Sequence, residues 1–358
     1  MLERRSLIKA FISSTLAAAL LPAVLVNANA STKSAATVNP RGVYKPNRLQ
    51  AGQTIGLIAP SSNTWEDQEI YFAMDIIRSF GFKVKTAEHL FERTAYLAGS
   101  DQDRASDLNA MFGDNSVDAI FCLRGGYGSP RILPYLDYEL IRKNPKVFLG
   151  YSDVTALLNA IYARSQIMTF HGPIAKQSFT DYTLTQFKSV LFDPVSHMVL
   201  AAPPPFEIVE GQAELANRLT TVSKGKTSGV LIGGNLSLMV KLVGSPYEPD
   251  YTDKILFLED VEEAPYRIDG MLTHLKLAGR LDKIAGLVFG KCTDCEVGSG
   301  PSFSIEHVLN DRLGDLGVPV LSGVMIGHIE DMATVPIGAM ATLDATNQKL
   351  TLDEPAVV

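Results

Sequence analysis

A serine lies where a strand is expected to turn into a helix. Residues 147–150 form an apolar run, the turn Tyr151-Ser152-Asp153 follows, and a second apolar run begins at Val154. A serine at such a turn projects its hydroxyl from the sheet, and the amides that begin the helix can receive an oxyanion. Ser152 is therefore a candidate nucleophile. A serine before a helix is also a common N-cap, and Val154 replaces the second glycine of a nucleophile elbow, so this segment alone leaves both interpretations open.

A glycine-rich segment follows another expected strand. Arg124-Gly125-Gly126-Tyr127-Gly128 comes directly after the apolar residues 117–123. Glycines let backbone amides approach a ligand closely, as an oxyanion hole requires. The spacing differs from the GxGxxG dinucleotide pattern and no P-loop lysine follows, so the segment gives little support to nucleotide binding. A turn that needs glycine only for positive φ angles is the alternative.

A serine nucleophile needs a base, and two of the six histidines lie where a base could act. His328 follows Gly327 in a loop between two expected strands, and His171 follows the strand after the Ser152 helix. Both positions suit a catalytic base, so His171 competes with His328. The other histidines lie in expected loops, or in helices without a polar turn around them: His89, His197, His274 and His307.

An acidic residue could orient that base. Glu259 comes at the end of the apolar run 255–258, whereas Glu262 and Glu263 lie in the following loop, where solvation is expected. The order serine, glutamate, histidine also occurs in α/β-hydrolases, but such triads recur on unrelated folds. An acidic pair that favours the dipole of the next helix is the alternative interpretation of Glu259-Asp260.

The elements around these residues alternate between strand and helix. Short apolar runs predict strands at 54–59, 82–86, 117–123, 147–150 and 167–170. Helical spacing of apolar residues predicts helices at 65–80, 101–112, 131–143 and 154–164. This alternation is typical of a parallel sheet covered by helices on both faces.

The second half has a different pattern, and a chain of 358 residues is expected to form about two domains. The pattern predicts a turn at Gly233-Gly234 that opens a helix, strands at 255–258 and 284–289, a helix at 265–278, and a closing hairpin at 339–343 and 349–352. The expected organisation is α/β: a signal (1–30), a flexible leader (31–47), an N-terminal parallel-sheet domain (48–175), a linker region (176–218), and a smaller mixed α/β domain (219–358).

The first thirty residues have the features of an export signal. Arg4 and Arg5 precede an apolar run of 17 residues, and Ala28-Asn29-Ala30 is typical of a cleavage site. The run is shorter than the roughly 20 residues of a membrane helix, so no stable membrane insertion is expected. The paired arginines resemble a twin-arginine signal and predict an exported, periplasmic protein.

Net charge and cysteine content indicate which partners and which cysteine chemistry to expect. The chain has 32 Lys and Arg against 39 Asp and Glu, a net charge of −7 without a basic block, so no nucleic-acid partner is expected. Cys292 and Cys295 form a C-x-x-C without further zinc ligands, which favours a loop with incidental cysteines over a local disulfide. Cys122 lies in an apolar run and is expected to be buried.

Many collinear segments resemble the LD-carboxypeptidase family, serine peptidases that include the microcin C self-immunity carboxypeptidases. They extend from Ile55 to about Leu352: IGLIAPSS, YLAGSDQDRASDLNAMF, LRGGYGSPRILPYLDYELI, FLGYSDVTALL, TFHGP, GGNLSLMVKLVGSPYEP, LFLEDVEEAPYRIDGML and GHIEDMATVPIGA. The resemblance implies Ser152 as nucleophile, Glu259 as the acidic triad member and His328 as base, the same residues that the patterns indicate. It also implies an active site in a cleft between the two domains.

Further expectations follow from the resemblance. The oxyanion would be bound by the amide of Asp153 and one amide of Gly125 or Gly126, without a metal or cofactor. Arg124 and Ser61 are candidate contacts for the terminal carboxylate of a substrate. Family members are usually dimeric, which implies a homodimer. The chain departs from the family at Gly270, where arginine is common, and in TVPIG, which replaces TLPIG.

The expected activity is release of the terminal D-Ala from murein tetrapeptides through an acyl-enzyme. An immunity-type enzyme that cleaves a peptide-nucleotide antibiotic is one alternative. An exported binding protein that uses the same cleft without turnover is another. Whether the acyl side carries meso-diaminopimelate or lysine is left open by the sequence.

Overall fold

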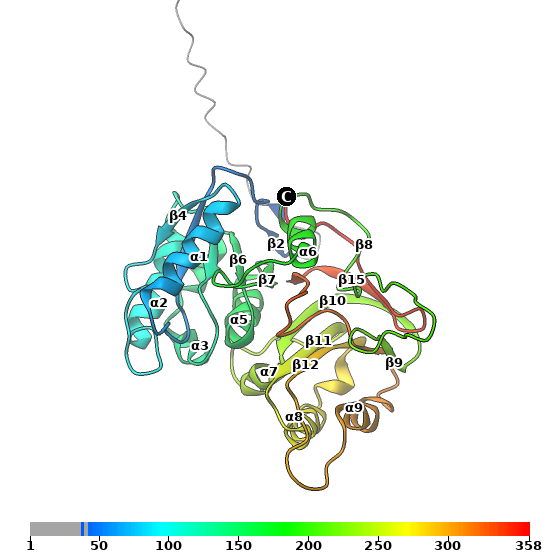
Figure 1. Cartoon of the computed structure of the whole chain (residues 1–358). Helices are drawn as coiled ribbons and strands as arrows, with labels where there is room; N and C mark the ends of the chain where they lie inside the picture. Colours follow the sequence, from blue (N-terminus) through cyan, green and yellow to red (C-terminus); the bar gives the residue numbers. More distant parts are fainter. Residues whose placement is uncertain (1–36, 39–41) are drawn as a thin grey trace, which may run out of the picture. The chain divides into compact units, whose positions relative to one another are not determined.

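A six-stranded sheet built mostly from the first half of the chain carries the serine turn (Figure 1). Its order is β14-β7-β6-β5-β3-β4, with β14 antiparallel to β7 and the other pairs parallel. The strands are β3 (Thr54–Ile58), β4 (Lys83–Thr86), β5 (Ala119–Cys122), β6 (Val147–Gly150), β7 (Thr169–His171) and β14 (Val335–Ile337). This computed structural model describes residues 37–38 and 42–358, so the expected signal and much of the leader lie outside the described residues.

Helices pack on this sheet as the alternation predicts. Every residue of β5 and β6 is buried, which strands covered on both faces require. The helices are α1 (Asp67–Ser79), α2 (Asp101–Gly113), α3 (Ser129–Ile132), α4 (Tyr138–Lys143), α5 (Thr155–Ser165) and α6 (Asp181–Leu191). Ser100 caps α2 by accepting from the Asp103 amide, and the Asp103 side chain accepts from the Ser100 amide in return.

The helix predicted at 131–143 is wrong as a single element. It divides into α3, a short 3-10 turn at Leu133–Tyr135, and α4. Pro134 has no amide hydrogen and cannot continue an α-helix, so the chain turns there. Asp137 then starts α4 by accepting a hydrogen bond from the Leu140 amide.

An eight-stranded mixed sheet carries the acidic candidate Glu259 on β11. Its order is β8-β16-β15-β10-β11-β12-β13-β9, and the four strands from β10 to β13 run parallel. The strands are β8 (Met198–Val199), β9 (Thr220–Ser223), β10 (Lys226–Asn235), β11 (Lys254–Val261), β12 (Gly286–Thr293), β13 (Val320–Ser322), β15 (Met340–Asp344) and β16 (Lys349–Leu352). Its helices are α7 (Leu236–Leu242), α8 (Pro265–Leu277) and α9 (Ile305–Leu313), and a separate ribbon pairs β1 (Thr37–Val38) with β2 (Tyr44–Lys45). The expected two-part α/β architecture is confirmed.

Three features differ from the simple sequence pattern. Gly233 and Gly234 lie within β10, directly before its last residue Asn235, and do not form a turn before α7. The segment 176–218, expected as linker, contains α6 and β8. β14 comes from the C-terminal half yet joins the first sheet beside β7, so residues 35–358 form one compact unit.

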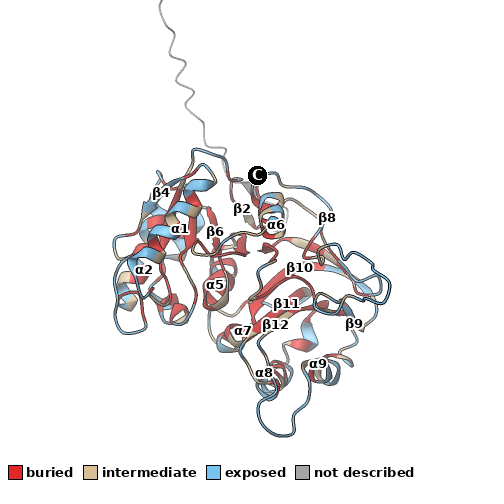
Figure 2. Cartoon of the chain, viewed as in Figure 1, coloured by how far each residue is buried: buried red, intermediate tan, exposed pale blue. Residues whose placement is uncertain are grey.

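The two sheets meet where α5 packs against the end of β10 (Figure 2). The Asn159 side chain donates to the Gly233 carbonyl at 2.8 Å and accepts from the Gly233 amide at 3.2 Å. One helical turn away, the Asn235 amide donates to Thr155 Oγ1 at 3.0 Å. Asn159 and Thr155 are both fully buried, so these bonds replace water at both partners. This polar contact holds the strand–turn–helix of the serine against the second sheet.

We expect Asn159→Ala to destabilise the fold strongly, because it leaves both polar groups of Gly233 buried without partners. Each such group costs about 1–3 kcal/mol, so the midpoint of urea unfolding should fall clearly. Asn310→Ala is the matched control. Asn159 also donates to the Thr155 carbonyl four residues earlier at 2.9 Å, and Asn310 makes the equivalent bond to the Glu306 carbonyl at 2.8 Å on an exposed helix face. Equal urea midpoints for the two variants would contradict a docking role for Asn159.

Candidate active site

Ser152 lies at a strained turn between β6 and α5. Its φ angle is +63°, a region that residues other than glycine rarely adopt. The side chain is half-buried, so the hydroxyl borders solvent rather than the core. Strain at a strand-to-helix turn is the geometry in which a nucleophile is presented above a sheet. The structure therefore retains the nucleophile interpretation of Ser152 over a plain N-cap, because no side-chain capping bond is made there.

The glycine-rich loop packs directly on this turn. A Cβ atom on Gly125 would lie 2.8 Å from Ser152 Cβ and 3.2 Å from the Asp153 amide nitrogen. Gly126 has a φ angle of +105°, and a Cβ there would lie 2.5 Å from Ser62 Oγ. Ser62 fixes the loop, because its amide donates to the Gly125 carbonyl at 3.3 Å and its Oγ accepts from the Tyr127 amide at 3.0 Å. Only glycine permits these approaches.

Asp153 anchors the turn through its own side chain. The carboxylate accepts from the Ser129 amide at 2.7 Å, and the Asp153 carbonyl accepts from the Ser129 hydroxyl. Asp153 is 1% exposed, so its carboxylate is a structural group and does not face solvent. Its amide belongs to the first turn of a helix, where N–H groups lack helical partners. That amide and the glycines beside it could together receive an oxyanion.

Glu259 and His328 form a hydrogen-bonded pair. His328 Nδ1 lies 2.8 Å from Glu259 Oε2; Glu259 is fully buried, and the His328 side chain is 17% exposed. Burial raises the pKa of Glu259, and the hydrogen bond from His328 offsets part of that shift. Glu259 Oε1 has no hydrogen-bond partner among the described residues. The pair presents a carboxylate behind an imidazole whose outer edge reaches solvent.

The His328 loop approaches Glu259 through two glycines. Gly327 has a φ angle of +137°, and a Cβ there would lie 3.4 Å from Glu259 Oε2. A Cβ on Gly290 would lie 2.2 Å from the Ile326 carbonyl, which also accepts from the Lys291 amide at 2.8 Å. The loop is thus bonded to β12, the strand beside the one that bears Glu259.

Tyr151 joins the serine turn to the histidine loop. Its ring centroid lies 4.8 Å from that of His328, and Tyr151 directly precedes Ser152. The structure thus brings Ser152, Glu259 and His328 into one region, although Ser152 Oγ makes no hydrogen bond to His328 in the part of the chain described. Catalytic hydrogen bonds are often longer without substrate and shorten in the complex.

His171, the competing base, lies in a different environment. It is fully buried, and neither ring nitrogen has a hydrogen-bond partner among the described residues. Burial, with a smaller effect from His328, lowers the pKa of His171 to about 3, so it stays neutral. Its ring packs edge-on against Tyr151 at 5.9 Å and against Phe257 at 5.5 Å. Without a carboxylate partner or solvent access, His171 is a poorer base than His328.

Asn235 and Asp260 lie next to Glu259 and are bonded to each other. Sequence reasoning missed Asn235 and named Asp260 only as part of an acidic pair. Asn235 pairs with Glu259 across β10 and β11, and its side chain donates to Asp260 Oδ1 at 2.9 Å. Asp260 Oδ2 also accepts from the Ser237 amide and hydroxyl, at 3.0 and 2.9 Å. The segment Gly-Gly-Asn-Leu-Ser carried a usable signal, because asparagine before an apolar run is a typical N-cap and Asn235 caps α7.

The two expected substrate contacts, Arg124 and Ser61, lie in different environments. Arg124 is half-buried and donates to the Asn63 carbonyl at 2.9 Å, so its guanidinium lies beside the glycine loop. Ser61 has no exposed surface, and its hydroxyl lacks a partner among the described residues. A contact through the backbone amides around Ser61 stays a prediction. The chain buries Ser61 behind the loop, and Ser62 is the serine that contacts it.

The cysteines differ from expectation in part. Cys292 and Cys295 form a disulfide, so the prediction of incidental cysteines is wrong and the local alternative is correct. Cys122 is fully buried, as expected, and burial raises the pKa of its thiol.

Within residues 37–38 and 42–358, no cluster of His, Cys, Asp or Glu could hold a metal ion. No helix in these residues is long and apolar enough to cross a membrane.

Comparisons with known proteins identify the family of this chain. The model of the LD-carboxypeptidase N-terminal domain matches residues 55–172, and that of the C-terminal domain matches residues 228–343. The chain is 39% identical over 311 residues to a probable murein peptide carboxypeptidase of Bacillus subtilis (strain 168), covering 87% of this chain and 94% of that relative.

Solved structures show the same fold. The microcin C7 self-immunity protein MccF without ligand matches with a TM-score of 0.79 and 27% identity, over 88% of this chain and 99% of MccF. A muramoyltetrapeptide carboxypeptidase from Oxalobacter formigenes matches with a TM-score of 0.70 and 27% identity, over 84% and 98% of the two chains. By sequence and by fold, this chain therefore belongs to the LD-carboxypeptidase family.

Proposed function

We propose that this protein is a serine LD-carboxypeptidase that releases the terminal D-Ala from murein tetrapeptides. The observation that carries the proposal is the 2.8 Å bond between His328 Nδ1 and the buried Glu259, beside the strained turn of Ser152. A histidine with one nitrogen on a buried carboxylate and an exposed edge is the arrangement of a general base. The relative in Bacillus subtilis, named as a probable murein peptide carboxypeptidase, supports the substrate class.

The chemistry begins with proton transfer from the serine. Glu259 accepts the Nδ1 hydrogen of His328, which leaves Nε2 free to take the Ser152 proton as Oγ attacks the scissile carbonyl. The imidazolium then donates that proton to the leaving amine of D-Ala, and an acyl-enzyme remains on Ser152. Water attacks the ester with His328 again as base, and the shortened peptide leaves.

The oxyanion of each tetrahedral intermediate needs donors next to Ser152. The Asp153 amide and the amides of Gly125 and Gly126 are the donors we propose, because the loop packs on Ser152 with no side chain between them. Arg124, at the start of that loop, is our candidate for the terminal carboxylate, since arginine can bind a carboxylate with two parallel bonds.

Turnover of a peptide-nucleotide antibiotic is the second candidate, because the match to MccF has the higher TM-score, 0.79 against 0.70 for the muramoyltetrapeptide carboxypeptidase. Net charge disfavours it, since a chain at −7 attracts anionic nucleotides poorly. Parallel assays of a murein tetrapeptide and an aminoacyl sulfamoyl adenosine would separate the two candidates.

We further propose that the enzyme is exported to the periplasm by the signal at residues 1–30 and acts there as a homodimer. The Cys292–Cys295 disulfide supports export, because disulfides persist in oxidising compartments. Size-exclusion chromatography with light scattering would measure the mass in solution. Fractionation of cells that express the full chain would locate the protein.

Ser152→Ala should abolish turnover while the fold remains. We expect kcat on a murein tetrapeptide to fall roughly 10⁴- to 10⁶-fold, because neither attack nor an acyl-enzyme is possible without the hydroxyl. Mass spectrometry of the peptide after incubation would follow loss of one D-Ala. Near-normal activity in Ser152→Ala, with the wild type active, would exclude Ser152 as nucleophile.

Glu259→Gln should lower activity and raise stability at neutral pH. Loss of the carboxylate should reduce kcat about 10³- to 10⁴-fold, because the correct His328 tautomer is no longer favoured. Burial raises the pKa of Glu259 above its ordinary value of 4.5, so the wild type loses stability as pH rises through the interval between these two pKa values. The melting temperature of the variant should therefore exceed that of the wild type at pH 8 and converge with it near pH 4.

Glu262→Gln, on the exposed loop, is the control for this prediction. A melting temperature of Glu259→Gln below that of the wild type at pH 8 would contradict this account.

Gly125→Ala should displace the nucleophile. The new Cβ would lie 2.8 Å from Ser152 Cβ, so one of the two backbones must move, and a shift of about 1 Å can lower kcat about 10²-fold. Gly113→Ala is the control, because its new Cβ meets only Leu140 at an ordinary 3.5 Å. Equal steady-state rates for both variants would show that the loop does not constrain Ser152.

A further inference from the structure

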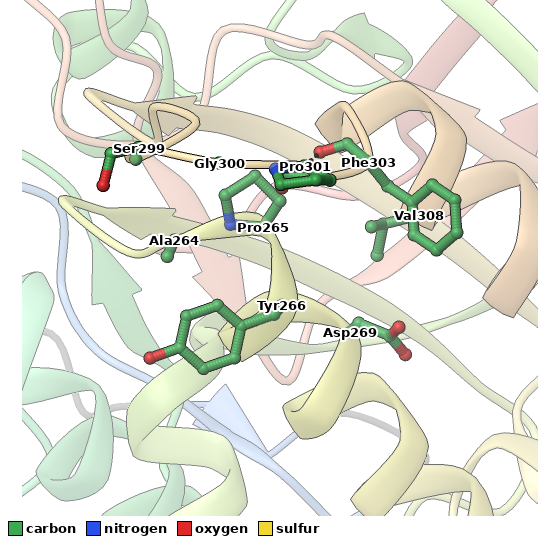
Figure 3. Close-up of a pocket in the computed structure, with 11 residues that line it drawn as sticks. Ala264, Pro265, Tyr266, Asp269, Ser299, Gly300, Pro301, Phe303 and Val308 are labelled. Carbon is green, nitrogen blue, oxygen red and sulfur yellow. Dashed lines mark hydrogen bonds between the residues drawn. The ribbon is translucent and has the colours of Figure 1, made fainter.

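A cavity of about 480 Å³ lies outside the site described above (Figure 3). It is bounded by the first turn of α8, by the loop 298–303 and by Val308 of α9. Figure 3 shows the ring of Tyr266 on the α8 side and the ring of Phe303 beside Val308. This volume is in the range of sites for small molecules.

The cavity opens at the sheet edge that also carries Glu259. α8 begins at Pro265, shortly after β11 ends at Val261, and the loop 298–303 follows the end of β12. β11 and β12 are parallel neighbours, so their carboxyl ends meet at one edge. Glu259 lies in β11 two residues before its end. The cavity therefore lies at the same edge of the sheet as Glu259.

Two aromatic rings at the cavity are exposed without a covering element. Tyr266 is 73% exposed and Phe303 is 58% exposed. The Phe303 ring stacks on His307 with centroids 4.2 Å apart, which leaves its other face free. Exposed apolar side chains that gather around one cavity on a folded protein commonly mark a binding surface.

The charges around the cavity are neutralised within the protein. Asp269, which lines it, lies 3.4 Å from Arg312, and Glu263 lies 3.1 Å from Arg267 in the turn that leads to it. No basic side chain lines the cavity in the part of the chain described. A phosphate or carboxylate would therefore find no partner here, whereas a neutral ligand would suit the rings and the exposed Ser299 hydroxyl.

The loop that bounds the cavity is held at both ends. The Cys292–Cys295 disulfide ties its start to β12, next to Asp260 of β11. At its far end Ser304 caps α9 by accepting from the His307 amide at 3.2 Å. A loop fixed in this way loses less entropy when a ligand binds.

We propose that this cavity binds a neutral N-acetylated pyranose ring of the murein glycan, attached to the peptide that Ser152 cleaves. The proposal rests on the function proposed above. The apolar C–H face of a sugar packs on Tyr266 and Phe303, while its hydroxyl and acetamido groups bond with Ser299 and backbone groups of the loop. The enzyme would then prefer muropeptides that keep their sugars over free tetrapeptides.

Binding without turnover tests the cavity directly. Calorimetric titration of Ser152→Ala with the disaccharide of N-acetylglucosamine should show saturable binding. Adding Tyr266→Ala or Phe303→Ala should weaken it about tenfold, as expected for loss of one aromatic face. Leu277→Ala is the control, because Leu277 is an 85% exposed apolar residue at the far end of the same helix. No binding to Ser152→Ala, or equal binding in Tyr266→Ala, would overturn the proposal.

Turnover separates this proposal from the function on which it rests. We expect a kcat/KM about tenfold higher for the disaccharide tetrapeptide than for the free tetrapeptide, and Tyr266→Ala should abolish only that difference. If neither peptide is cleaved, the proposed function fails while the titration still decides the cavity. If Tyr266→Ala alters the mass in solution, the cavity is a contact between copies of the chain, and the sugar proposal is wrong.

Discussion

The proposed active site depends on the docking of α5 against the end of β10, because the candidate residues are divided between two sheets and the loop that joins them. Ser152 begins the 3-10 turn Ser152–Val154 that leads into α5, and Glu259 lies on β11, the strand beside β10. The two hydrogen bonds between Asn159 and Gly233 hold α5 against β10. Without them the buried amide and carbonyl of Gly233 would lack partners, which would lower the stability of the fold. A buried side chain that bonds with both the amide and the carbonyl of one residue fixes the position of the helix relative to the strand. Apolar contacts alone would define that position less sharply. The geometry of the serine and the histidine thus follows from a polar contact that touches neither.

Close backbone approach is the second constraint, and glycine supplies it at each junction. A Cβ on Gly234 would lie 2.6 Å from Thr155 Oγ1, at the contact of α5 with β10. Gly125 meets Ser152 in the same manner. Gly327 differs, because its φ angle of +137° favours glycine while a Cβ there would meet Glu259 at an ordinary 3.4 Å. The absence of side chains is what lets three segments distant in sequence share one small region.

Local patterns could predict the elements but not the contacts between them. The strand, turn and helix around Ser152 and the strand that ends near Glu259 follow from short apolar periods, and both were predicted. The choice between His328 and His171 could not be made from the residues, because it depends on which loop passes beside Glu259. Asn159 was missed for the same reason: its partner is 74 residues away, and an asparagine in an apolar helix carries no sign of it. The break at Pro134, by contrast, was readable from the sequence, since proline interrupts a helix wherever it stands.

Three unfavourable features lie together at the candidate site, although positive φ angles and unpaired buried polar atoms also occur elsewhere in the described chain. Ser152 holds a positive φ angle, Glu259 is a fully buried carboxyl with one oxygen unpaired, and His171 is buried with both ring nitrogens unpaired among the described residues. Each could be relieved by a substitution of similar size that keeps the packing, such as glycine, glutamine or phenylalanine. Strain and unsatisfied polar groups of this kind persist where chemistry needs them.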